Sequence, residues 1–104
     1  MQGLIVLTTT PDLKSAKEIA KSLVTQKLAA CVSYRSGFIS TYRWKGKVER
    51  SKETVLLIKT LTSHFVKIRK VIQALHPYQL PELIALPIIR GSRDYLAWMN
   101  EVLK

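Results

Sequence analysis

The sequence predicts an α+β fold in which two helices cover one face of an antiparallel sheet of four strands. Three observations carry this prediction. Short β-branched apolar runs and amphipathic helical patterns follow one another in the order β-α-β-β-α-β. The two middle strands form an unusually long hairpin, with Gly46 as the best turn residue. Finally, 104 residues, of which 47% are apolar, suffice for one core, so residues 1–104 are expected to form a single domain.

The first strand and the first helix are predicted close to the N-terminus. Residues 3–8 form a short apolar run bounded by polar residues, which is typical of a buried strand. Thr10 is the expected N-cap of the helix that follows, because Pro11 fits the first helical position and Asp12 complements the helix dipole. Apolar residues then recur at helical spacing, so this helix should cover the sheet. These apolar positions are Leu13, Ala16, Ile19, Ala20, Leu23 and Val24.

Residues 29–48 and 49–60 are predicted to pair as a hairpin that turns near Gly46. Each arm would hold about 12–15 residues and reach ~40 Å, whereas a globule of this size has a radius of gyration of ~13 Å. Part of the hairpin must therefore project from the domain. Its aromatic side chains would be exposed unless another chain buries them, so they are candidates for a subunit interface. They are Tyr34, Phe38, Tyr42 and Trp44.

The second half of the chain repeats the order of helix and strand. Thr62 or Ser63 is expected to cap a second amphipathic helix, which Pro77 ends. Residues 83–89 are predicted as the fourth strand. Because proline cannot donate to a sheet ladder, Pro87 within this strand indicates a sheet edge or a bulge.

A short helix over residues 94–103 completes the chain. The whole order is that of a ferredoxin-like split βαβ fold with an extra C-terminal helix. Such a sheet has one open face and two edges. Together with the long hairpin, these unpaired surfaces predict self-association into a closed, symmetric assembly.

The chain is strongly basic, with 17 Lys and Arg against seven Asp and Glu and a formal charge of +10. This charge attracts polyanions and repels free metal cations at long range. A basic cluster on the hairpin is interleaved with aromatic residues, a composition that superficially suits single-stranded nucleic acid. The other basic residues are dispersed, so we do not expect nucleic-acid binding. The cluster comprises Arg43, Lys45, Lys47, Arg50 and Lys52.

Several other classes of protein are not expected. No stretch approaches the length of a membrane span, and the N-terminus carries no secretory pattern, so a cytoplasmic protein without membrane contact is expected. The single cysteine, Cys31, cannot form an internal disulfide, which agrees with a reducing compartment. There is no phosphate loop, nucleophile elbow or metalloprotease motif, so we do not expect an enzyme.

The segment His76-Pro77-Tyr78-Gln79-Leu80-Pro81-Glu82 is the strongest candidate for a site, because two prolines in five residues make it stiff. His76 could bind copper through a neutral imidazole. It could equally be a residue that caps the C-terminal end of the helix. No second His or Cys stands at ligand spacing, so the structural interpretation is favoured.

Four polar residues are expected near a cleft between subunits. Glu53 and Lys59 come from the hairpin, whereas Tyr78 and Glu82 come from the stiff segment. Since buried charges are usually paired, they could form a structural network of ion pairs. If Lys59 is instead unpaired in a pocket, it indicates an anionic ligand.

These segments, in this order and at these spacings, resemble the CutA family of divalent-cation tolerance proteins, and the resemblance covers nearly the whole chain. The segments that carry it are Thr8-Thr9-Thr10-Pro11, Lys27-Leu28-Ala29-Ala30-Cys31-Val32, Tyr42-Arg43-Trp44-Lys45-Gly46-Lys47-Val48-Glu49, residues 53–60, residues 76–83 and Tyr95-Leu96-Ala97-Trp98.

The resemblance implies a ferredoxin-like protomer in a tight homotrimer, a fold shared with PII-like signalling trimers. It also implies a role in tolerance of, or response to, divalent metals, copper above all, through Cu²⁺ or another divalent cation bound to the protein or through ligand signalling at subunit clefts. In copper-binding members, a cysteine falls at the position of Thr8 and paired histidines fall at Leu75 and His76, which leaves His76 as the metal-ligand candidate. The alternative is a PII-like scaffold that binds a protein or a small anion without metal.

Overall fold

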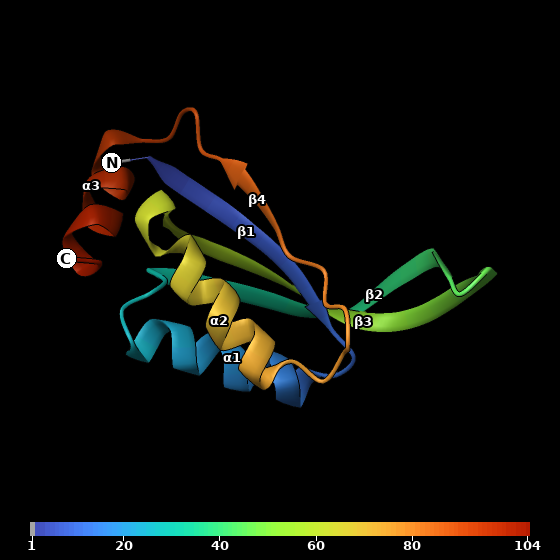
Figure 1. Cartoon of the computed structure of the whole chain (residues 1–104). Coiled ribbons are helices and arrows are strands. Elements are labelled where there is room, and N and C mark those ends of the chain that lie inside the picture. The colour runs from blue at the N-terminus through green and yellow to red at the C-terminus, as the bar shows by residue number, and fades with distance from the viewer. Residues whose placement is uncertain (1) are drawn as a thin grey trace.

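The computed structural model describes residues 2–104 and shows a four-stranded antiparallel sheet in the order β2-β3-β1-β4. Helices α1 and α2 lie side by side on one face of this sheet, and α3 lies at the end that holds both termini (Figure 1). The predicted ferredoxin-like fold with an extra C-terminal helix is confirmed. The elements are β1 (Gly3–Thr10), α1 (Leu13–Thr25), β2 (Cys31–Trp44), β3 (Lys47–Leu61), a short 3₁₀ helix η1 (Thr62–His64), α2 (Phe65–Leu75), β4 (Ile84–Pro87) and α3 (Arg93–Val102).

Helix α1 begins two residues later than the sequence suggested, because Asp12 and not Thr10 is its N-cap. The Asp12 carboxylate accepts a 2.8 Å hydrogen bond from the backbone N–H of Ser15, which also lowers the pKa of this carboxyl group. The Thr10 hydroxyl instead donates to the backbone carbonyl of Asp12 at 2.7 Å. Pro11 therefore precedes the cap and does not occupy the first helical position.

The start of α2 also differs from the prediction, since neither Thr62 nor Ser63 caps this helix. Both belong to η1, which leads directly into α2 at Phe65 without a side-chain cap. The Thr62 hydroxyl donates across the molecule to the Gln2 carbonyl at 3.2 Å. The end of α2 agrees with the prediction, because the helix stops just before Pro77.

Strand β4 is shorter than the seven residues predicted, but its position is the one that Pro87 indicated. It lies at an edge of the sheet and pairs with β1, with Leu4 opposite Pro87 and Leu7 opposite Ile84. An edge position tolerates proline because the missing N–H would face solvent.

The core lies between the helices and one face of the sheet, as strict alternation along β1 and β3 dictates. Val6 on β1 is opposite Ile58 on β3, and both side chains are fully buried beneath the helices. Their partners from the two helices are equally buried, namely Ile19 and Leu23 of α1 and Ile68 and Ile72 of α2.

The β2–β3 hairpin is longer than the body of the protein, as predicted. Its arms contain 14 and 15 residues, and the molecule measures 44 × 25 × 23 Å although its radius of gyration is only 14.2 Å. Lys45 and Gly46 turn the chain with φ values of 49° and 80°, the positive pair that a tight type I′ hairpin turn requires. In Figure 1 the hairpin projects from the end of the molecule opposite the termini.

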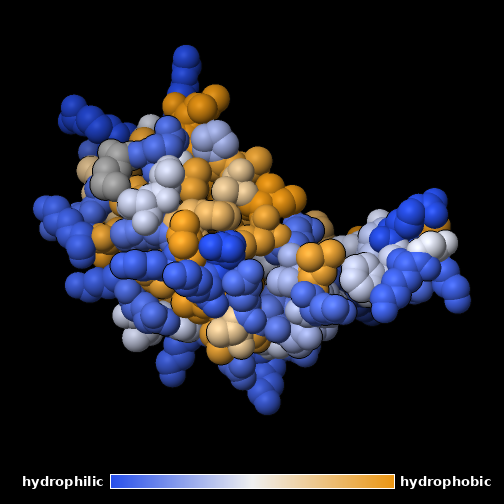
Figure 2. Space-filling model, in the orientation of Figure 1, coloured by the Kyte–Doolittle hydropathy of each residue, from blue (hydrophilic) through white to orange (hydrophobic). Residues whose placement is uncertain are grey.

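The second face of the sheet has no helix over it and is largely apolar. Ile5, Leu7 and Leu57 from the central strands share this open face with Ile84 and Leu86 of β4, and the last three side chains are 38–50% exposed. Figure 2 shows hydrophobic side chains gathered along β4, whereas hydrophilic side chains cover the tip of the hairpin. An apolar face of this extent is typical of a surface that another chain covers.

One buried hydroxyl in the core is unsatisfied, which yields a test of the packing. Among residues 2–104 no hydrogen-bond partner lies within reach of the Thr8 hydroxyl, although Thr8 is fully buried. The substitution Thr8→Val should therefore raise the free energy of unfolding by about 1 kcal/mol, measured by denaturant unfolding at fixed protein concentration.

Thr60→Val is the matched control, because Thr60 is equally buried but its hydroxyl donates to the Leu28 carbonyl at 2.6 Å. In this control the free energy of unfolding should fall by about 1–3 kcal/mol, since the Leu28 carbonyl is left without a hydrogen-bond partner. Equal effects of the two substitutions would contradict the assignment.

Candidate functional site

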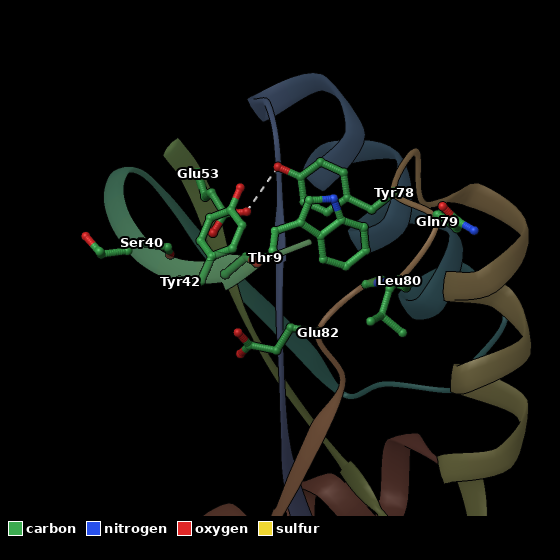
Figure 3. A pocket seen from close by; sticks show the side chains of 11 residues that line it. Thr9, Ser40, Tyr42, Glu53, Tyr78, Gln79, Leu80 and Glu82 are labelled. Atoms are coloured by element: carbon green, nitrogen blue, oxygen red, sulfur yellow. Dashed lines mark hydrogen bonds between the residues drawn. The ribbon is translucent and has the colours of Figure 1, made fainter. Parts of the chain in front are cut away.

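A cleft of about 670 Å³ opens where the hairpin leaves the body of the protein and the segment after α2 passes over it. Its walls come from β1, from both arms of the hairpin and from residues 78–82, as Figure 3 shows. This volume lies within the range of small-molecule sites. The lining residues are Thr9, Ser40, Thr41, Tyr42, Trp44, Glu53, Tyr78, Gln79, Leu80, Pro81 and Glu82.

The segment that closes the cleft is anchored by His76. The imidazole is 8% exposed; its Nε2 lies 2.6 Å from the Thr9 carbonyl, and its Nδ1 accepts from the Tyr78 N–H at 3.1 Å. Since Nδ1 is an acceptor here, Nε2 carries the proton that it donates to Thr9. His76 therefore ties the C-terminal end of α2 to the end of β1.

This arrangement bears directly on His76 as a metal ligand. A metal binds the lone pair of a ring nitrogen, and in this conformation the Nδ1 lone pair is taken by Tyr78 while Nε2 is protonated. No group of three or more His, Cys, Asp or Glu side chains within residues 2–104 is arranged to hold a metal ion. The geometry therefore does not fit a copper site centred on His76.

Within the cleft, the side chains of Glu53 and Tyr78 are hydrogen-bonded to each other. The Tyr78 hydroxyl donates to the Glu53 carboxylate at 3.1 Å, and the Glu53 side chain is 7% exposed (Figure 3). Burial, together with this carboxylate, raises the pKa of Tyr78 to about 12, so the hydroxyl keeps its proton. The contact also joins the hairpin to the segment after α2.

Three of the four polar residues predicted for the cleft are brought together, and the fourth is not. Glu53, Tyr78 and Glu82 line the cleft, whereas Lys59 lies about 20 Å further along β3, six residues away. There Lys59 donates to the Ser33 hydroxyl at 2.7 Å and lies 3.8 Å from the Cys31 sulfur. Lys59 therefore does not line this cleft of the protomer, and its place in a cleft between subunits stays a prediction.

The four aromatic residues predicted for a subunit interface are all exposed in the protomer, but they lie in two places. Tyr42 and Trp44 line the cleft, and Trp44 is 39% exposed. Tyr34 is opposite Leu56 and Phe38 is opposite Glu53, on the two sides of an irregularity in the pairing of β2 with β3. The interface itself stays a prediction.

Three lining residues, Thr9, Ser40 and Thr41, escaped the sequence reasoning, although a signal existed for Ser40. Ser40 precedes Tyr42 by two residues and shares its face of β2, so strand alternation could have placed it. Thr9 lines the cleft because β1 runs two residues beyond the predicted 3–8. Only the pairing of β1 with β3 reveals this extension.

The cleft carries negative charge in a basic protein. Glu53 and Glu82 line it, and none of its lining residues is Lys or Arg. Throughout residues 2–104 the one ion pair within 4.0 Å joins Lys104 to Glu101, so no Lys or Arg of this part of the chain forms an ion pair with Glu53. The cleft is therefore suited to a cation and not to an anion.

The fold and the site together define a class: ferredoxin-like proteins with an over-long β2–β3 hairpin and a polar cleft at its base. Residues 4–102 match the family described as CutA1 divalent ion tolerance protein. The chain belongs to this family.

Similarity to individual CutA proteins extends over nearly the whole length of the chain. The chain is 48% identical over 97 residues to the divalent-cation tolerance protein CutA of Thermus thermophilus, a match that covers 93% of this chain and 94% of the relative. A solved Thermus thermophilus structure of the divalent cation tolerance protein superimposes with a TM-score of 0.95 at 46% identity, covering 98% of this chain and 99% of that one. The structure of CutA from Xylella fastidiosa gives 0.96 at 43% identity, with both chains covered completely.

The cellular compartment is less uniform among the relatives. A solved structure from Archaeoglobus fulgidus, 36% identical with a TM-score of 0.94 and both chains covered completely, is described as a periplasmic divalent cation tolerance protein. In this chain, none of the helices formed by residues 2–104 has the length and apolar character needed to cross a membrane. The cytoplasmic location stays a prediction.

The raised pKa of Tyr78 gives a pH-dependent test of the contact with Glu53. Between pH 10 and pH 12 the unfolded chain releases the Tyr78 proton while the folded chain keeps it, so the stability of the folded state should fall as the pH rises through this window. This part of the fall should be absent in Tyr78→Phe. Tyrosinate absorbance and the free energy of unfolding, followed over the same window, measure both effects.

Tyr95→Phe is the control, because Tyr95 lies on α3 outside the cleft. This variant should keep the component of the titration that Tyr78→Phe removes. A difference titration between the native protein and Tyr78→Phe with a midpoint at or below pH 10 would contradict the assignment.

Proposed function

We propose that this protein acts in divalent-cation tolerance as a non-catalytic homotrimer, which responds to a ligand held in the cleft at the base of its hairpin. The observation that carries the proposal is the position of Glu53, a buried carboxylate that opens into this cleft without a cationic partner among residues 2–104. The family membership supports the link to divalent cations.

Self-assembly is supported by two surfaces that a lone protomer leaves uncovered. The first is the apolar open face, which includes Leu57, Ile84 and Leu86. The second is the outer part of the hairpin, because β3 pairs with β1 only from Thr54 onward. Three copies related by symmetry would cover both surfaces in a closed assembly.

Ligand signalling is favoured over direct copper binding by the donor atoms that the cleft offers. Two carboxylates line it, whereas copper sites usually contain imidazole or thiolate ligands, and the His76 nitrogens are both engaged. A small anion is not favoured either, since Lys59 lies elsewhere and the cleft is acidic.

A second candidate function is a PII-like scaffold for a protein partner. It is favoured by the hairpin, where Ile39 and Val48 are 61% and 69% exposed. A partner could pair with the edge of β2 or cover these side chains. The experiment that favours this reading is recovery of a stoichiometric partner that is lost when Ile39 and Val48 are replaced by serine.

Assembly is tested by the substitution Trp44→Ala. If the Trp44 ring is buried between copies, its loss should weaken assembly about tenfold or more and lower the melting temperature, because large aromatic residues often dominate interfaces. Sedimentation velocity over a dilution series measures the change. Trp98→Ala is the control, since Trp98 is similarly exposed but lies on α3; unchanged assembly in Trp44→Ala would contradict the proposal.

Direct copper binding is tested by calorimetric titration of Cu²⁺ into the native protein and His76→Ala. The expected result is the same heat from both proteins, because His76 offers no free lone pair. His64→Ala, with a histidine on the surface of η1 replaced, controls for adventitious binding. Saturable binding of one copper per chain that disappears only in His76→Ala would show that copper itself is the ligand.

A further inference from the structure

We infer that the cleft binds a short aliphatic diamine, with one ammonium group at Glu53 and the other at Glu82. This inference rests on the proposed function, because it names the chemical class of ligand for the same cleft. It adds what the family description does not contain, namely an organic cation in place of a metal.

The first step is the state of Glu53. Glu53 is only 7% exposed, yet the one group of the described residues that donates a hydrogen bond to its side chain is the neutral Tyr78 hydroxyl. A buried carboxylate is normally matched by a cation, because the cost of removing it from water is otherwise not recovered. Among residues 2–104 the protein supplies none to Glu53, although the chain carries 17 Lys and Arg.

The second step is the oxygen of the Glu53 carboxylate that has no hydrogen-bond partner among the described residues. Tyr78 bonds to Oε2, and Oε1 has no hydrogen-bond partner among the described residues while the residue lines the cleft. A group that completes this carboxylate must therefore enter through the cleft and donate a hydrogen bond. An alkylammonium group does both.

The third step is the aromatic wall beside Glu53. Tyr42, Trp44 and Tyr78 line the same cleft, and the electron-rich faces of such rings attract ammonium groups. The protein already shows this attraction, because the Lys45 ammonium lies 5.8 Å from the centroid of the Trp44 ring. Leu80 and Pro81 add apolar surface, which suits a methylene chain.

The fourth step is the second carboxylate. Glu82 lines the cleft from the segment after α2, whereas Glu53 enters it from β3 (Figure 3). Two carboxylates on different walls of a cleft that also has apolar lining residues match two ammonium groups joined by methylenes. A metal ion would need these oxygens to converge, and they form no group of three or more potential ligands.

The overall charge makes the test selective. A chain with a net charge of +10 repels small cations at long range, so non-specific binding of a diamine to its surface is disfavoured. Saturable binding is therefore expected from a local acidic site, and this cleft is such a site.

The experiment is calorimetric titration of putrescine and of butylamine into the native protein and three variants at moderate salt. Native protein should bind putrescine once per chain and bind it more tightly than butylamine. Glu53→Gln should weaken putrescine binding about tenfold or more, because a charge-assisted hydrogen bond is lost. Glu18→Gln is the matched control, since it removes the same charge from the exposed surface of α1 and should bind like the native protein.

Glu82→Gln separates the two ends of the ligand. In this variant putrescine should lose its advantage and bind about as tightly as butylamine, because the second ammonium has no partner left. This comparison holds even if Glu53→Gln folds poorly, which near-ultraviolet circular dichroism would reveal.

Two outcomes would overturn the inference. One is the absence of saturable heat with native protein; weaker assembly of Glu53→Gln would then show that the cation at Glu53 is a basic side chain of a neighbouring copy. The other is equal binding of putrescine to native protein and Glu53→Gln. Neither result would touch the proposed assembly or the copper titration, which are measured separately.

Discussion

The length of the β2–β3 hairpin is the constraint on which the rest of the structure depends. Strand β3 has β1 as a neighbour only over Thr54–Leu61, so its first seven residues are paired with β2 alone. An isolated two-stranded ribbon is marginally stable in water. The ribbon turns tightly at Lys45-Gly46, where both φ values are positive. Aromatic and apolar side chains along it are exposed in the protomer, so another surface could cover them.

The same hairpin creates the cleft, because the place where β3 passes beyond β1 is also the place where the segment after α2 returns to the sheet. His76 fixes this return by its contacts with Thr9 and Tyr78. Tyr78 in turn bonds to Glu53 and so links the segment to the hairpin. A change in the position of the hairpin would reach the cleft through these three contacts, and the proposed response to a ligand depends on this connection.

The distribution of charge separates the cleft from the rest of the molecule. The hairpin tip and both long helices carry most of the basic residues, whereas the cleft is lined by two carboxylates and three aromatic rings. The cost in this cleft is the burial of the Glu53 carboxylate, which a group of positive charge in the cleft would offset. The family name describes tolerance of divalent cations, and the acidic cleft offers a place where a cationic ligand could act.

The sequence by itself determined the order of the elements, the hairpin and its turn, and the edge position of Pro87, because each follows from a local pattern of hydrophobicity or from the backbone of glycine and proline. It also named Glu53, Tyr78 and Glu82, which line one cleft of the protomer. It could not assign the cap of α1 to Asp12, because Thr10, with an equally suitable side chain, bonds instead to the Asp12 carbonyl. Nor could it separate Lys59 from the cleft or show that both His76 nitrogens are occupied, since these facts depend on strand register and on contacts between residues up to 67 positions apart. Only the tertiary structure decides such contacts, because they form when distant segments pack together.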